Sequence, residues 1–319
     1  MLIRAGFLQP RSGLTRLTST VLTGRPTGFF NSEMLGQGAF QVDTFQADTF
    51  QETAGLPTSL LVAGTTQKLY VHVAGVFRDV SGAALTASSP NHARFATIAL
   101  GTPQTIYVIH SNGVNNPEQW DATTAVFGAM TGTPPLWSDV TTISEHVIGI
   151  VPPFNIRWGN TQAINTWPAA NVRVLSEGGD RLQAIAPLGV QAGVIYKTRS
   201  IWNVVVTGSG TESEYFRFEH RGSIEGPASP AAVVSVDEAA HLYMTPQGRV
   251  GYYNGVRHMW VGDGVWPLVA AEINEDNMNL AFGAFDPSYR VAVFVYPRTS
   301  DAVGDLTGWA LVMLPNPKE

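Results

Sequence analysis

Acidic residues at the ends of apolar runs are the best candidates for chemistry in this 319-residue chain. They are Asp79, Glu118, Asp121, Asp139, Asp237 and Glu238. Two carboxylates that converge on a glycosidic bond would supply the pair that a glycoside hydrolase needs. Trp120 lies between Glu118 and Asp121 in NGVNNPEQWD, and an aromatic ring beside carboxylates is a common sugar-binding set. Most of these acids also lie at turns, where binding the turn's own backbone is a sufficient role. We therefore expect no catalytic residue among them.

The histidines show no spacing typical of a metal or catalytic site. They are His72, His92, His110, His146, His220, His241 and His258. No His-x-x-x-His or His-Glu-x-x-His signature occurs, so a local zinc motif is absent from the sequence. The chain has no cysteine, which excludes disulfides and thiolate ligands. A Gly-x-Ser-x-Gly elbow and a phosphate-binding loop are also absent. We expect no catalytic, metal-binding or cofactor-binding residues, and no cofactor.

Composition argues against a tight nucleic-acid binder and against a membrane protein. Only 14% of the residues are charged, and the net charge is −6. Because no run of Lys or Arg exceeds two residues, strong binding to phosphates over a basic face is disfavoured. No 18-residue apolar run occurs, and the N-terminus lacks the apolar core of a signal peptide. The sequence therefore predicts no membrane contact and at most passive contact with DNA.

Short strand-like runs alternate with turns from Ser59 onward. The runs are rich in Val, Ile, Tyr, Phe and Thr, and Gly, Pro, Asn or Asp bounds most of them. Roughly fifteen to twenty strands are implied, and the only plausible helix covers Pro267 to Asn279. Since helical patterns do not separate the strands, a parallel α/β sheet is excluded. Sandwich, barrel, β-helix and propeller architectures remain.

A repeat favours the propeller. Leu69-Tyr70-Val71 matches Ile106-Tyr107-Val108, and Gly75-Val76 matches Gly113-Val114. Strand pairs begin near Ser59, Arg94, Thr141, Asp180, Ala231 and Asn279. Their spacing of about 35 to 50 residues is that of a four-stranded propeller blade. The sequence thus predicts an all-β propeller of about six four-stranded blades over residues 56–319, with five or seven blades as alternatives. Residues 1–55 are predicted to form an extended N-terminal arm.

The repeat also assigns structural roles to the candidate ligand site. The aromatic at each blade's end is expected to fill the gap between blades, and the Asp or Asn beside it to bond the following turn. NGVNNPEQWD is then a blade hairpin, with Trp120 packed between blades and Asp121 holding a turn. Its extra loop, Asn115 to Gln119, is expected to contact a partner subunit. The stretch VGDGVW (Val261 to Trp266) resembles part of the Asp-box of sialidase-like propellers, in which the Asp turn is structural.

Four stretches carry a further resemblance, in their order along the chain. They are SNGVNNPEQWDA (111–122), IRWGNTQAINTWP (156–168), EGGDRLQAIAPLGVQAGVIYKTRSIWNVVVTG (177–208) and GSIEGPASPAAVVSVDEAAHLYMTPQGRVGYYNG (222–255). This series resembles the β-propeller proteins of tailed-bacteriophage virions, such as tail nozzle, tail tubular B-like and tail hub proteins. The resemblance covers roughly residues 59 to 290.

The resemblance implies a non-enzymatic structural component of the virion tail. Such a subunit belongs to a nozzle, hub or head–tail junction ring that forms part of the DNA conduit and serves DNA ejection. Its partners would be copies of itself in a ring and other virion structural proteins. The alternative from the residues alone is a carbohydrate-binding or glycoside-hydrolase-like propeller. A protein-interaction propeller of cellular origin is the remaining hypothesis.

Overall fold

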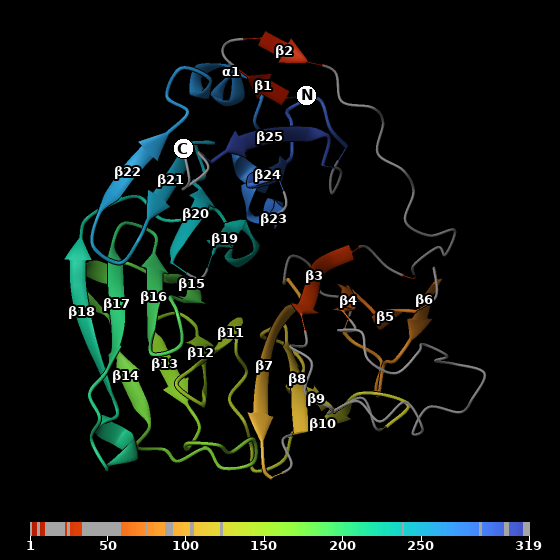
Figure 1. The fold of residues 1–319 in the computed structure, drawn as a ribbon, viewed down its shortest axis with the longest axis vertical. Coiled ribbons are helices and arrows are strands. Elements are labelled where there is room, and N and C mark those ends of the chain that lie inside the picture. Colours follow the sequence, from red (N-terminus) through yellow and green to blue (C-terminus); the bar gives the residue numbers. More distant parts are fainter. Residues whose placement is uncertain are drawn as a thin grey trace. The chain divides into compact units, whose positions relative to one another are not determined.

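The computed structural model has an all-β fold, drawn in Figure 1. It describes residues 2–4, 7–9, 23, 26–33, 59–73, 76–86, 92–102, 105–121, 124–237, 239–286, 289–302 and 306–314. Apart from a two-stranded hairpin near the N-terminus, these residues form six antiparallel sheets, each made of strands consecutive in sequence. Five sheets have four strands, and the sixth has three within the described residues. The fold class is a six-bladed β-propeller, as predicted, which excludes the alternatives of five and seven blades.

The strands of the six blades have the following bounds. The first two blades contain β3 (Pro26–Glu33), β4 (Ser59–Thr65), β5 (Leu69–Val73), β6 (Val76–Asp79), β7 (Arg94–Leu100), β8 (Thr105–Ser111), β9 (Glu118–Trp120) and β10 (Gly128–Ala129). The third and fourth contain β11 (Asp139–Ile143), β12 (His146–Val151), β13 (Asn155–Trp158), β14 (Val172–Val174), β15 (Leu182–Pro187), β16 (Ala192–Lys197), β17 (Ile201–Val206) and β18 (Phe216–Gly222). The fifth and sixth contain β19 (Val233–Val236), β20 (Ala240–Met244), β21 (Val250–Tyr253), β22 (His258–Val261), β23 (Phe282–Asp286), β24 (Val291–Tyr296) and β25 (Gly308–Met313).

The predicted blade starts agree with the observed ones from the second blade onward. The first strands β7, β11, β15, β19 and β23 begin at Arg94, Asp139, Leu182, Val233 and Phe282. The predicted starts near Arg94, Thr141, Asp180, Ala231 and Asn279 lie within a few residues of these. The agreement arises because β-branched and aromatic runs bounded by turn residues are the local signature of strands.

The first blade begins earlier than predicted. Strand β3 pairs with β4, from Pro26 opposite Thr65 to Glu33 opposite Ser59. Part of the predicted N-terminal arm, residues 1–55, is therefore a blade strand. The hairpin of β1 (Leu2–Arg4) and β2 (Phe7–Gln9) forms a separate two-stranded sheet. The sequence PTGFFNSE of β3 shows no clean alternation of apolar and polar residues, so the pattern gave no strand signal there. Apart from Thr23, the rest of the predicted arm lies outside the described residues.

Within the residues that the structure describes, helical structure is confined to short pieces. The predicted helix over Pro267 to Asn279 is instead a five-residue helix, α1 (Trp266–Ala270), followed by the 3₁₀ helix η5 (Glu275–Leu280). Shorter 3₁₀ turns are η2 (Glu177–Gly179), η3 (Glu212–Glu214) and η4 (Pro230–Ala232). Ser229 caps η4 by accepting a hydrogen bond from the Ala232 N–H over 3.0 Å.

The described chain divides into two compact units. One comprises Leu17–Ile185 and Val206–Arg217, and the other Met1–Arg16, Ala186–Val205 and Phe218–Glu319. Within the first unit, the first strands of neighbouring blades lie side by side, β3 with β7 and β7 with β11. Within the second, β19 lies beside β23. Contact between the first strands of consecutive blades is what the radial repetition of a propeller requires.

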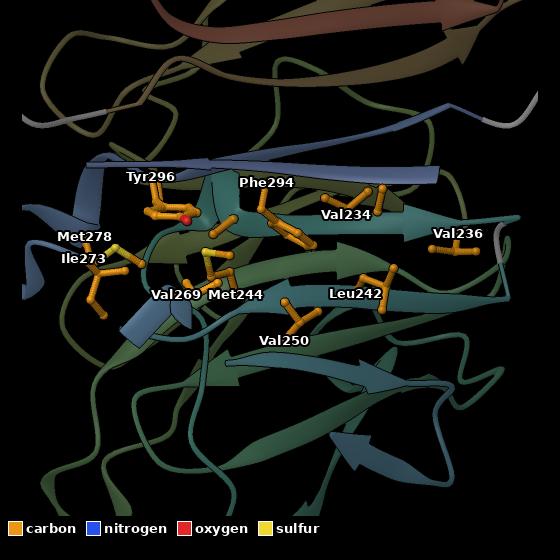
Figure 2. Packing of buried hydrophobic residues seen from close by; sticks show 13 residues of the cluster. Val234, Val236, Leu242, Met244, Val250, Val269, Ile273, Met278, Phe294 and Tyr296 are labelled. Carbon is orange, nitrogen blue, oxygen red and sulfur yellow. The ribbon is translucent and has the colours of Figure 1, made fainter. Parts of the chain in front are cut away.

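Apolar layers between consecutive blades form the cores of each unit. Figure 2 shows the layer between the fifth and sixth blades, in which Leu242 and Met244 of β20 pack with Phe294 and Tyr296 of β24. These four side chains are at most 1% exposed. In the other unit, Trp137 and Trp167 meet edge to face at 5.0 Å between the second and third blades. Burial of large side chains between blades is the main favourable term for such a fold.

Candidate functional site

The Trp120 site of the sequence is part of the scaffold. Trp120 is 1% exposed and belongs to the apolar cluster of β4 and β5 with β7 and β8, between the first and second blades. Its ring stacks on Phe127 at 5.5 Å, and its indole N–H donates to the Thr124 carbonyl over 2.8 Å. The predicted packing between blades is therefore confirmed. A sugar ring has no access to this indole.

The hairpin before Trp120 is held by asparagine side chains. Asn112 accepts hydrogen bonds from the backbone N–H groups of Val114 and Asn115 over 3.0 and 2.9 Å, and Gly113 has a φ of 75°. Asn115 in turn binds Thr86, donating to its hydroxyl over 3.0 Å and accepting from its N–H over 3.1 Å. The first residue of the loop expected to contact a partner subunit is thus bound within the chain, while Asn116 is exposed.

Glu118 is buried beside a histidine. The side chain of Glu118 is 7% exposed, and its carboxylate lies 3.3 Å from His110 Nδ1. The two residues are directly opposite each other on β9 and β8. Asp121, the second acid of this stretch, is half-buried just beyond β9. Since Glu118 faces inward, the structure does not present it together with Trp120 as a surface site.

Asp139 is a junction between three blades. It is fully buried, at the start of β11. Its carboxylate accepts hydrogen bonds from Arg94 Nε of β7 over 2.6 Å and from the Ile185 N–H of β15 over 2.8 Å. The N–H of Val140 donates to it as well, over 3.1 Å. These contacts occupy the carboxylate, which makes Asp139 a structural residue.

The remaining carboxylates also have local partners. Asp79 accepts from the Ser81 N–H over 3.0 Å, as the repeat predicted, and pairs with Lys68. Although burial raises its pKa, the hydrogen bonds from Lys68 and Ser81 outweigh burial and hold the pKa below its ordinary value. Asp237 pairs with Arg290 over 2.5 Å, and Glu238 lies outside the described residues. The five described acids lie on four different blades, so they do not form one catalytic group.

His146 joins a polar cluster that sequence reasoning did not predict. Its Nε2 lies 2.8 Å from Glu212 Oε2 and 3.0 Å from Thr161 Oγ1, and its Nδ1 lies 2.7 Å from the Ser144 carbonyl. The ring also packs on Tyr215 at 4.1 Å. Although burial raises the Glu212 pKa, hydrogen bonds from His146 and Thr161 outweigh it and lower that pKa overall. The cluster fixes the segment 206–217 to the third blade.

A second histidine is held inside the other unit. His241 is fully buried, with Nε2 2.8 Å from the Pro187 carbonyl and Nδ1 3.0 Å from the Tyr196 hydroxyl. Nε2 therefore donates and Nδ1 accepts, as in neutral imidazole. Burial lowers the His241 pKa to about 4, which keeps the ring neutral. Among the other histidines, His72 and His110 lie against Phe77 and Phe95, His92 is buried, and His220 is exposed beside Trp202.

The described residues hold neither a candidate metal cluster nor a membrane-spanning helix. In the described part of the chain, no group of three or more His, Asp or Glu side chains could hold a metal ion. Within the same residues, no helix is long and apolar enough to cross a membrane. The absence of metal-binding residues therefore stays a prediction from the sequence.

An arginine held between two tryptophans is the most distinctive feature of the fifth blade. The Arg249 guanidinium lies 4.4 Å from the ring centre of Trp260 and 5.0 Å from that of Trp266. Asp263 pairs with it over 3.2 Å. Trp266, Asp263 and their turn come from the Asp-box-like VGDGVW, which supplied a partial signal for this arrangement. The stacked geometry immobilises Arg249 by cation–π attraction.

A hollow of about 730 Å³ is lined in part by Pro246 and Gln247, which precede Arg249 in the sequence. Three segments line it: 198–199 from the turn after β16, 223–225 from the connection between β18 and β19, and 246–247 from the turn after β20. The Tyr243 hydroxyl donates to the Glu225 carbonyl over 3.0 Å and lies 2.9 Å from His258 Nε2. The Trp266 indole donates to the Gln247 carbonyl over 2.9 Å. The aromatic residues around Arg249 therefore position two of the lining segments.

The connection between β18 and β19 requires a glycine. A Cβ built on Gly226 would lie 1.9 Å from the Lys197 carbonyl oxygen, and the Gly226 N–H donates to the Thr198 carbonyl over 3.1 Å. Any side chain would force these two segments apart. The glycine thus sets the distance between two walls of the hollow. This connection leads from the fourth blade to the fifth.

Within the described residues, this hollow is the candidate functional site, since it joins an open cavity to positioned polar groups. Its polar side chains are Thr198, Arg199, Ser223, Glu225 and Gln247. Burial raises the pKa of Glu225 above its ordinary value, Glu275 adds to the rise, and Arg249 opposes it. Comparison of the chain with models of known protein families and with curated protein sequences finds no match.

Proposed function

We propose that this chain is a non-enzymatic structural component of a tailed-bacteriophage virion. It would form one subunit of a ring in the tail, at a nozzle, hub or head–tail junction, around the path of the DNA. The observation that carries the proposal is the six-bladed propeller, which is the fold that the sequence resemblance implies. The ordered motifs that carry the resemblance also fall on consecutive blades, from β8 in the second to β21 in the fifth.

The contacts of the candidate catalytic acids support a structural role for the chain. Asp139 binds three partners inside the scaffold, and Glu118 lies beside His110 in the interior. Asp79 and Asp237 are engaged in ion pairs. Buried acids that hold strands together stabilise a fold but do not meet a substrate.

Charge supports passive contact with DNA. With a net charge of −6, the chain gains little from counterion release when DNA passes, so DNA would slide without being retained. Polar Thr, Ser, Asn and Gln side chains on the surface suit wet contacts between subunits. The partners would be copies of the chain and other virion structural proteins, and the location would be the virion tail.

The alternative, a glycoside hydrolase-like or carbohydrate-binding propeller, was centred on Trp120 and its acids. Because Trp120 is 1% exposed, that stretch offers no platform for a sugar. The alternative thus loses the observation that first suggested it.

Negative-stain electron microscopy of the purified chain, with its mass in solution from light scattering, tests the proposal. We expect ring-shaped oligomers with an open centre wide enough for duplex DNA. A chain that stays monomeric at every concentration, and also in the presence of particle lysate, would contradict the proposal.

A further inference from the structure

The hollow beside the fifth blade has the size of a small-molecule site. Its volume of about 730 Å³ falls within the range of ordinary ligand pockets. All three lining segments belong to the same compact unit. The proposed role in a virion ring does not require this hollow.

The lining offers both hydrogen-bond donors and acceptors. The Arg199 guanidinium donates only, the Glu225 carboxylate accepts, and the Gln247 amide does both. The hydroxyls of Thr198 and Ser223 also donate and accept. A ligand that matches this set must itself carry groups that donate and accept at closely spaced positions. The hydroxyls of a sugar have this property.

The charges of the lining disfavour other ligand classes. It contains one cationic side chain, Arg199, and one anionic side chain, Glu225. A phosphate group calls for an excess of cationic donors, which a neighbouring carboxylate would oppose. A divalent cation calls for several oxygen ligands of negative charge, and the lining supplies one carboxylate. A neutral ligand fits the balance best.

The walls of the hollow are preorganised. The carbonyl of Glu225 is held by the Tyr243 hydroxyl and that of Gln247 by the Trp266 indole. Gly226 brings the segment of Glu225 against the strand end at Lys197. Because these segments are already fixed, a ligand would lose little free energy to ordering them.

We propose that this hollow binds a neutral mono- or disaccharide. The Arg199 guanidinium would donate hydrogen bonds to the hydroxyls of the sugar, and the Glu225 carboxylate would accept hydrogen bonds from them. The inference goes beyond the role in the virion and does not depend on it. Ring assembly is read out by microscopy and saccharide binding by titration, so the failure of one is distinguishable from the failure of the other.

Saturation-transfer NMR followed by calorimetric titration tests this site on the full chain. The probes are glucose, galactose, N-acetylglucosamine, maltose and lactose. We expect at least one of them to bind at millimolar concentration or below. Arg199→Ala and Glu225→Gln should each weaken that binding roughly tenfold or more, because each removes a charge-assisted hydrogen bond.

Matched controls come from the same chain. Arg257→Ala and Glu214→Gln change exposed residues outside the hollow and should leave the affinity unchanged. Circular dichroism and the thermal midpoint confirm that each variant is folded. Two results would overturn the proposal: none of the five sugars binds, or a sugar binds with the same affinity to the wild type and to both folded hollow variants.

Discussion

The carboxylate of Asp139 in β11 accepts a hydrogen bond from the backbone N–H of Ile185 in β15 over 2.8 Å. The same carboxylate takes a hydrogen bond from Arg94 in β7. One side chain thereby connects the first strands of three consecutive blades. Since these strands share no backbone hydrogen bonds across blades, such polar contacts complement the apolar layers in fixing the blades relative to one another.

Replacement of Asp139 should therefore be costly. Asp139→Ala removes a buried carboxylate, so the Arg94 guanidinium and the Ile185 N–H lose the acceptor of their hydrogen bonds. We expect the free energy of unfolding to fall by about 3–5 kcal/mol, as measured by urea denaturation. Asp276→Ala, at an exposed acid of η5, should change it by less than about 0.5 kcal/mol. Equal effects of the two substitutions would show that Asp139 is not a junction.

The stability effect of replacing Trp120 distinguishes a structural role of this residue from a role in binding a ligand. Trp120→Ala empties part of the layer between the first and second blades and should lower the free energy of unfolding by about 3–5 kcal/mol. Trp309, which is 42% exposed on β25, offers the comparison. Trp309→Ala should cost clearly less because less of the ring leaves water on folding. A small effect at Trp120 would support a platform for a ligand instead.

Glu212 should hold the segment 206–217 in place. Glu212→Gln removes the charged acceptor of His146 and Thr161, so amide hydrogen exchange in this segment should become faster at neutral pH. Glu214→Gln, two residues away and exposed, is the control. Exchange rates that are the same in the two variants would contradict the role given to Glu212.

The lowered pKa of Glu212 also sets a pH dependence with a definite sign. The folded state binds this proton more weakly than the unfolded state, whose pKa is near 4.5. The stabilisation by Glu212 is thus present above pH 4.5 and lost as the pH falls through the lower folded value. The difference in free energy of unfolding between wild type and Glu212→Gln should shrink over that range. A difference that grows on acidification would refute the pairing.

Protonation linked to His241 should make the fold less stable as the pH falls, over a range that lies above that of Glu212. Its pKa is about 4 in the folded state against 6.5 as the ordinary value. Between these two values the unfolded state takes up the proton and the folded state does not, so stability falls as the pH decreases from 6.5 to 4. The full effect is on the order of 3 kcal/mol. Equilibrium unfolding at a series of pH values should show this loss in the wild type and not in His241→Asn, with exposed His220→Asn as the control.

The blades were predictable because their signal is local. Runs such as RFATIAL at β7 and TIYVIHS at β8 carry strand propensity, and Asn112-Gly113 carries the turn. The repeat then set the architecture, because four-stranded units at this spacing have few other solutions. The place of Trp120 between blades followed from the repeat as well. Strand β3 was missed because its eight residues lack a period.

The polar constellations were not predictable because they depend on contacts far apart in sequence. His146 and Glu212 are separated by 66 residues, and Asp139 and Ile185 by 46. Their meeting requires the register of strands and the order of blades, which a single sequence does not specify. The hollow likewise combines three segments from two blades and their connection. The stretches 177–208 and 222–255 and the Asp-box-like turn of Asp263 and Trp266 pointed to that region, but not to a hollow.

Immunogold electron microscopy of phage particles whose genome encodes this chain tests the central claim most directly. We expect gold label at one position on the tail or at the head–tail junction of intact particles, and we expect this label to disappear when the gene is deleted. Purified particles that carry no label, while the chain is found only in the soluble part of the lysate, would contradict a role as a virion component.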